Sequence, residues 1–203
     1  MKSNLLNMAL VLTLTCLVCS GILAGAYVLT KDPISEAAAR KSSEAIAKVL
    51  PEFTSVSEED ASLAGVNYHY FKAEGPSGLV GYAVRSTVSG FGGPLTLMVG
   101  ITADGLVYNT SVLSHSETPG LGAKCETDPA FMAQWKGFDP AAKTLAVRKD
   151  GGDVDAITAS TITSRAYTLA VANAVEVVRS LAGEPVDAAT GASIIIKEEQ
   201  CDE

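Results

Sequence analysis

A long apolar run near the N-terminus constrains the fold of this chain more than any other feature. Residues 3–30 contain no Asp, Glu, Lys, Arg or His, and most of them are apolar. Met8 to Leu29 alone supplies about 22 positions, enough for a helix that crosses a hydrocarbon layer of about 30 Å. A cleaved signal peptide is the alternative, but its apolar region normally has only about 7–15 residues. We therefore predict a single-pass membrane anchor over residues 1–31.

The charges that flank this run leave the orientation of the anchor open. Lys2 precedes the run, whereas Lys31, Arg40, Lys41 and Lys48 follow it. By the positive-inside rule, this distribution favours a domain in the cytoplasm. The rule weakens when a long domain follows the membrane segment, as it does here.

The remainder of the chain fits one acidic globular domain. About 170 residues follow the anchor, which is enough for a hydrophobic core. The 203-residue chain has a formal net charge of −8, and no basic stripe with interleaved aromatic residues is present. Because binding to nucleic acid requires clustered Lys and Arg, we predict no nucleic-acid partner. The single tryptophan, Trp135, is expected in the core or on a helix.

The four cysteines do not predict a metal site. Cys16 and Cys19 have the Cys-x-x-Cys spacing, but they lie inside the apolar run and no second pair follows. The chain also has only two histidines. Cys125 and Cys201 could form a disulfide in an oxidising compartment, but their separation in the sequence gives no geometry.

Hydrophobic patterns beyond the anchor predict an α+β fold, in which a block of strands is flanked by helices. Asp32 as N-cap and Pro33 at the first helical position predict a stalk helix over residues 32–52 that continues from the anchor onto the domain. The polar stretch Glu58 to Gly65 predicts a connection. The predicted strands are Asn67–Ala73, Gly78–Val88, Leu95–Thr102, Leu106–Leu113 and Thr144–Arg148, with a hairpin turn at Ala103-Asp104-Gly105. The predicted helices are Phe131–Phe138, begun by Asp128-Pro129, and Thr163–Leu181. This domain is expected over residues 53–183, followed by an acidic tail over residues 184–203.

The stretch Asp155-Ala-Ile-Thr-Ala-Ser-Thr161 gives the strongest functional signal, because it leads into the apolar, helix-forming run Ala166–Leu181. The first N–H groups of a helix have no partner within it, and together with the helix dipole they favour a phosphate. The hydroxyl of Thr161 lies in the same turn, so a phosphate could also be bonded to it covalently. An ordinary Ser/Thr N-cap is the alternative and, on these residues alone, the more common arrangement.

The same stretch resembles the flavinylation motif of the FMN-binding family, Asp-x-x-[Ser/Thr]-Gly-Ala-[Ser/Thr]. In that family FMN is joined through its phosphate to the last hydroxyl, which corresponds to Thr161 here. Ala159 and Ser160 stand where glycine and alanine are usual, and Ala159 is expected to resist a backbone with positive φ. The resemblance implies covalent FMN at Thr161, with Thr158, Ser160 and Ile162 beside it.

A second match to this motif lies near the C-terminus. Asp187-Ala-Ala-Thr-Gly-Ala-Ser193 contains the consensus glycine and alanine. However, three isoleucines and an acidic end follow it, rather than a long amphipathic helix that could present its N-terminus. We favour Thr161 and keep Ser193 as the alternative attachment site.

Two further segments match the family. Gly90-Phe-Gly-Gly-Pro94 precedes a β-rich run rather than a helix, so it does not fit a dinucleotide-binding loop; a plain inter-strand loop and a turn close to a flat ligand are equally compatible with it. Glu117-Thr-Pro-Gly-Leu-Gly122 leaves a strand, because Pro119 has no N–H to continue it. The resemblance implies that this loop lines the isoalloxazine ring of FMN. The implied contacts are Leu121 on the face of the ring, Glu117 and Thr118 at its polar edge, Gly120 and Gly122 in the loop, and Lys124 near its pyrimidine end.

Together with the anchor, these segments resemble the G subunit of Rnf-type ion-translocating electron-transport complexes, to which the C subunit of the sodium-pumping NADH:quinone oxidoreductase is related. The resemblance implies a flavoprotein subunit of a translocase, linked to ferredoxin and NAD, that performs no complete turnover alone. It also implies partner membrane subunits, a flavin transferase for maturation, and an extracytoplasmic flavin domain at the bacterial inner membrane. Two other classes stay open: an anchored FMN-binding redox sensor, and an anchored binding module without flavin.

Overall fold

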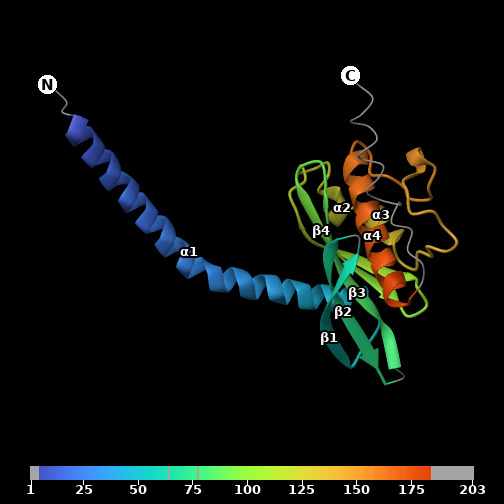
Figure 1. Cartoon of the computed structure of the whole chain (residues 1–203). Coiled ribbons are helices and arrows are strands. Elements are labelled where there is room, and N and C mark those ends of the chain that lie inside the picture. Colours follow the sequence, from blue (N-terminus) through green and yellow to red (C-terminus); the bar gives the residue numbers. More distant parts are fainter. Residues whose placement is uncertain (1–4, 64, 77, 184–203) are drawn as a thin grey trace. The chain divides into compact units, whose positions relative to one another are not determined.

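The computed structural model describes residues 5–63, 65–76 and 78–183. It divides the chain into two compact units, Met1–Lys41 and Ser42–Glu203. The second unit combines a five-stranded antiparallel sheet with helices, which confirms the predicted α+β fold (Figure 1).

Helix α1 runs without interruption from Leu5 to Val49. The predicted N-cap at Asp32, with Pro33 at the first helical position, is therefore wrong, because Pro33 lies inside α1, which continues from the anchor segment into the stalk segment. Proline removes one backbone hydrogen bond, but the apolar run before it and the alanine-rich sequence after it are both good helix formers. Among the described residues, this is the one helix long and apolar enough to cross a membrane, and its 45 residues span about 68 Å.

The five strands follow one another in the sheet in sequence order. They are β1 (Ser55–Leu63), β2 (Val66–Gly75), β3 (Gly78–Ser89), β4 (Pro94–Thr102) and β5 (Val107–His115). The four predicted strands in this block are confirmed, with ends that differ by at most two residues. The hairpin turn is confirmed as well, since Gly105 has a φ of 82° and its N–H donates to Thr102 O at 2.9 Å.

Strand β1 replaces the predicted polar connection over Glu58–Gly65. Its side chains are mostly exposed, so the polar sequence carries no apolar alternation, yet its backbone pairs with β2 along its whole length. Tyr70 on β2 donates a hydrogen bond to Glu59 at 2.5 Å, which raises the pKa of the Tyr70 phenol to about 12. Charged side chains on an exposed edge strand oppose pairing with other chains.

The two faces of the sheet pack on different helices of the second unit. Alternate residues on one face lie in the larger core with α4 (Thr161–Leu181), which crosses the sheet in Figure 1 and contacts β3 and β4. The opposite face packs on the last turns of α1. This contact needs a glycine at position 100, because a Cβ there would lie 1.7 Å from the carbonyl oxygen of Val49.

The segment between β5 and α4 is mostly irregular. It contains α2 (Lys124–Thr127), α3 (Pro129–Ala133) and a 3₁₀ turn η1 (Arg148–Asp150). Helix α3 begins at the predicted Asp128 cap but ends before Phe138, whereas the predicted strand Thr144–Arg148 is wrong, since only Val147 forms an isolated bridge with Val154. Trp135 is fully buried, which confirms its expected place in the core.

Candidate flavin site

Helix α4 begins at Thr161 with little local capping. Ser160 occupies the N-cap position, but its side chain makes no capping hydrogen bond. Ser164 instead stabilises the turn from inside the helix: its hydroxyl donates to Ser160 O and accepts from Ile157 N–H, both at 2.9 Å. The ordinary N-cap arrangement is thus not formed by Ser160. The N-terminal end of α4 keeps backbone donors and a positive dipole end that favour an anion.

Ala159 adopts a left-handed conformation just before this helix. Its φ of 63° is the only positive φ of a non-glycine residue in the described part of the chain. Ala159 thus adopts a positive φ despite the expected resistance of alanine, a conformation that glycine takes without a steric cost. For an L-residue this conformation costs about 1–2 kcal/mol.

Substitutions at Ala159 test this strain. We expect Ala159→Gly to raise the thermal midpoint by about 1–2 °C, because strain relief of about 1–2 kcal/mol exceeds the entropic cost of glycine of about 0.5–1 kcal/mol. Ala159→Val should lower the midpoint, since β-branched residues tolerate positive φ least. Thermal unfolding followed by circular dichroism measures both. Equal midpoints for the three proteins would contradict the left-handed conformation.

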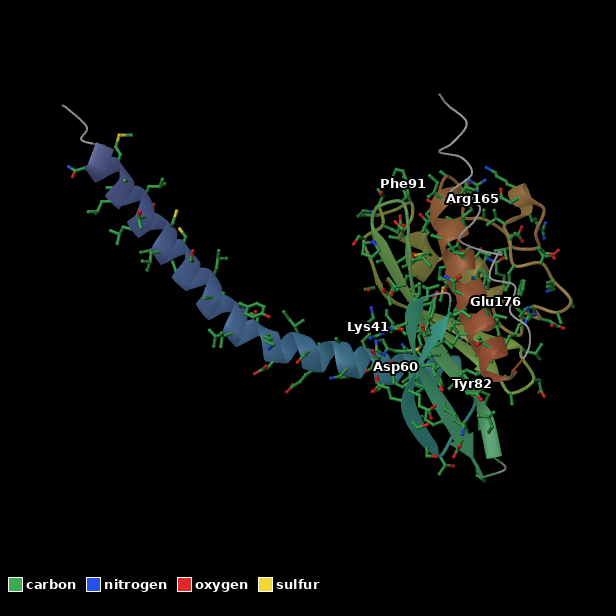
Figure 2. The ribbon with its side chains drawn as sticks, in the orientation of Figure 1. Lys41, Asp60, Tyr82, Phe91, Arg165 and Glu176 are labelled. Carbon is green, nitrogen blue, oxygen red and sulfur yellow. The ribbon has the colours of Figure 1, made fainter. Side chains whose placement is uncertain are left out.

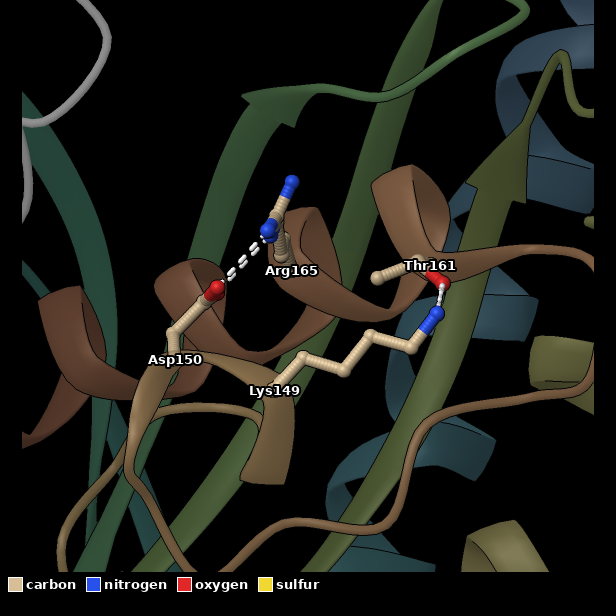
Figure 3. A network of polar contacts seen from close by, with 4 residues as sticks. All are labelled: Lys149, Asp150, Thr161 and Arg165. Atoms are coloured by element: carbon tan, nitrogen blue, oxygen red, sulfur yellow. Dashed lines mark hydrogen bonds and ion pairs between the residues drawn. The ribbon is translucent and has the colours of Figure 1, made fainter.

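The hydroxyl of Thr161 lies at the surface of this turn. Thr161 is partly exposed, and Lys149 Nζ lies 3.4 Å from its Oγ1 (Figure 3). Thr158 and Ile162 are exposed beside it, whereas Ser160 is buried. The predicted attachment residue is therefore accessible and has a cation close to it. Lys149 was not predicted from the sequence, because it lies outside the matching motifs.

Glu117 lies beneath the site and connects three segments. The residue is only 5% exposed, and its Oε1 accepts a hydrogen bond from Phe91 N–H at 2.8 Å. Its Oε2 accepts from Gly92 N–H at 3.4 Å and from the Thr163 hydroxyl at 2.9 Å. The carboxylate thus joins the β3–β4 loop and the first turn of α4 to its own loop. All these contacts are within the protein, so the role of Glu117 is to hold the loops and the first turn of α4 together.

Glycines in the two loops make room for this carboxylate. A Cβ at Gly90 would lie 2.0 Å from Glu117 Oε1, and one at Gly122 would lie 2.5 Å from Glu117 Oε2. At Gly92, a Cβ would lie 2.2 Å from Ser116 O. A Cβ at Gly120 would meet open space, and the φ of 76° explains the choice of glycine there. The Gly90–Gly93 turn passes close to a carboxylate of the protein itself.

Three large apolar side chains next to the Glu117 network are exposed. Phe91 is 67% exposed, Ile162 52% and Leu121 45%. Phe91 donates its backbone N–H to Glu117, and Leu121 and Ile162 each precede a residue in contact with that carboxylate. Figure 2 shows Phe91 on the β3–β4 loop. An accessible hydroxyl, an anion-favouring helix end, a cation and exposed apolar side chains fit a phosphorylated, flat, apolar ligand such as FMN.

The remaining residues singled out in the sequence differ in their exposure and position. Thr118 and Lys124 are exposed, with Lys124 at the first position of α2. Ser193 and Cys201 lie outside the described residues. Cys125 is buried, and burial raises the pKa of its thiol to about 11, so that little of the reactive thiolate forms at neutral pH.

Comparisons with known proteins find matches to both the N-terminal segment and the domain. The profile of the FMN-binding domain matches residues 90–176, and that of the RnfG N-terminal region matches residues 1–49. The G subunit of the proton-translocating ferredoxin:NAD(+) oxidoreductase complex of Clostridium ljungdahlii is 34% identical over 175 residues, or 85% of this chain and 90% of that protein. The chain belongs to the family of G subunits of ion-translocating oxidoreductase complexes.

The chain is also similar to proteins of other organisms. The G subunit of the ion-translocating oxidoreductase complex of Methanosarcina acetivorans is 35% identical over 172 residues, which covers 82% of this chain and 90% of that protein. A crystal structure of Shewanella oneidensis NqrC is 26% identical and covers 62% of this chain and 65% of that chain, with a TM-score of 0.42. From the two profiles and the curated relatives, this G subunit contains an FMN-binding domain, and its N-terminal apolar helix fits a membrane anchor.

Proposed function

We propose that this G subunit carries electrons through FMN joined by its phosphate to Thr161. The observation that carries the proposal is the accessible Thr161 hydroxyl at the uncapped start of α4, inside the segment that the FMN-binding profile matches. FMN, when bound, supplies the redox chemistry. The protein tethers it, orients it and sets its electrostatic surroundings. A covalent tether suits a carrier at a membrane surface, where a dissociated cofactor is lost.

The described residues suggest how the chain would hold the flavin. Phe91, Leu121 and Ile162 offer apolar contact for the ring system, and their loops are fixed by the Glu117 hydrogen bonds. Thr118, Gly120 and Gly122 belong to the same loop, and Lys124 follows it at the start of α2. The positive end of the α4 dipole and the ammonium of Lys149 favour the phosphate.

The proposed setting is a membrane complex. The relatives are named as subunits of ion-translocating oxidoreductase complexes, and the name of the Clostridium ljungdahlii complex includes ferredoxin and NAD. We propose that this chain likewise works with other membrane subunits of a complex linked to ferredoxin and NAD. A separate flavin transferase would form the bond to Thr161. We place residues 1–31 as a single-pass anchor of the bacterial inner membrane and residues 32–52 as a stalk. The flavin domain would occupy residues 53–183 on the extracytoplasmic side, followed by a tail over 184–203.

The mass of the mature chain tests the attachment. The intact protein, purified from cells that contain the other subunits and the transferase, should weigh as much as its amino acids plus FMN less one water. Tandem mass spectrometry should place that addition on the peptide that contains Thr161. An intact mass equal to that of the amino acids alone contradicts the proposal, and an addition on the peptide with Ser193 moves the site to the tail.

A further inference from the structure

Lys149 is the side-chain cation in contact with the proposed attachment hydroxyl. It lies in the 3₁₀ turn η1, 12 residues before Thr161, and its Nζ is 3.4 Å from Thr161 Oγ1 (Figure 3). A lysine ammonium only donates hydrogen bonds, so the threonine oxygen is the acceptor. Any group esterified to that oxygen would extend from a position that the ammonium already reaches.

The turn that carries Lys149 is fastened to α4. Asp150 receives two hydrogen bonds of 2.7 Å from the guanidinium of Arg165, one helical turn after Thr161. These bonds lower the pKa of the Asp150 carboxyl, which therefore stays ionised at neutral pH. A bidentate pair fixes the relative orientation of the two segments better than a single contact does. Figure 3 shows both links between η1 and the first turns of α4.

Hydrogen bonds and close packing also hold the backbone around η1 in place. Arg148 N–H donates to Val154 O at 2.9 Å, and Gly151 closes the turn with a φ of 84°. A Cβ at Gly152 would lie 2.0 Å from Ala146 O, so the chain folds tightly back on itself here. Lys149 thus extends from a rigid base, which reduces the conformational freedom lost when its ammonium pairs with an anion.

The charges around Thr161 leave Lys149 suited to one added negative charge. Arg165 faces the carboxylate of Asp150, and Arg148 forms an ion pair of 3.0 Å with Asp155. The charge of Lys149 also acts on the neighbouring Asp150 carboxylate, which is paired with Arg165, but the ammonium itself contacts the uncharged hydroxyl of Thr161. A phosphate joined at two of its oxygens keeps one ionised oxygen, so the phosphodiester of FMN on Thr161 would supply that charge. We propose that Lys149 is the counter-ion of this phosphodiester and that the Asp150–Arg165 pair positions it. This role rests on the attachment proposed above.

A thermodynamic cycle tests this role without measuring activity. Lys149→Met is placed in the flavin-carrying protein and in a Thr161→Val protein that carries no flavin. We expect the substitution to lower the thermal midpoint of the flavin-carrying protein by about 2–4 °C, the shift of one charge-assisted contact in a domain of this size, and to leave the flavin-free midpoint unchanged. Flavin fluorescence follows unfolding of the first protein, and the fluorescence of Trp135 follows the second.

Two controls separate charge from local structure. Lys149→Arg keeps the charge and should restore most of the midpoint, whereas Lys136→Met removes an exposed lysine elsewhere and should act equally in both backgrounds. Equal shifts of the thermal midpoint for Lys149→Met in both backgrounds would show that Lys149 stabilises the fold independently of the flavin. No shift in either background would show that its charge does not stabilise the phosphate. Absence of flavin from Thr161 appears earlier, in the peptide mapping of the unmutated chain, so the two failures are distinct.

Discussion

Thr161→Val is expected to abolish covalent flavin while leaving the protein folded. Valine has nearly the shape of threonine but lacks the hydroxyl, so no phosphoester can form. Thr161 is partly exposed at the first position of α4, and surface substitutions of this kind usually change the free energy of unfolding by less than about 0.5 kcal/mol. After denaturing electrophoresis, the band of the unmutated chain should fluoresce under ultraviolet light, and the band of the variant should not.

Matched variants make this result specific. Thr144→Val removes an exposed hydroxyl outside the matching motifs and should keep the fluorescence of the unmutated chain. Thr161→Ser keeps a hydroxyl at the same position and should keep at least part of it. A fluorescent Thr161→Val band together with a dark Ser193→Ala band would assign the flavin to the C-terminal motif instead.

The sequence predicted those parts of the fold in which local pattern and tertiary structure agree. The strands β2 to β5 and helix α4 have side chains that are apolar on the face they bury, and this periodicity is visible in the residues. Strand β1 was missed, because its formation depends on backbone pairing with β2 rather than on burial of its polar side chains. The predicted helix start at Pro33 was wrong for a related reason, since the local sequence does not distinguish a proline within a helix from one at its first position.

The sequence motif predicted the position of Thr161, but it did not predict which residues from other segments lie around it. The motif placed Thr161 at a helix start, and the structure has it at the first position of α4. Lys149 and Phe91 reach the site from segments 12 and 70 positions earlier, through the contacts of η1 and Glu117. Such long-range contacts leave no local pattern. Glu117 itself was predicted at the ring's polar edge, but its buried hydrogen bonds could not be anticipated from a loop sequence that reads as exposed.

Glu117→Gln is expected to destabilise the domain by about 2–4 kcal/mol. The glutamine has nearly the same volume, but its amide nitrogen donates hydrogen bonds where the second carboxylate oxygen accepted them. One amide orientation would set this nitrogen against Phe91 N–H; the other would set it against Gly92 N–H and the Thr163 hydroxyl. Each buried donor left without an acceptor costs about 1–3 kcal/mol, and the loss of a charged acceptor weakens the remaining bonds.

Urea unfolding in the Thr161→Val background measures this effect without any contribution from flavin. The fluorescence of Trp135, the single tryptophan, reports on the core between the sheet and α4. Glu126→Gln serves as the control, because Glu126 is an exposed carboxylate nearby that contacts His115 at 3.4 Å. An unfolding midpoint for Glu117→Gln equal to that of Glu126→Gln would contradict the role of Glu117 as the acceptor that holds the two loops on α4. A loss confined to Glu117→Gln would show that the order of the flavin site is built into the protein before any cofactor is attached.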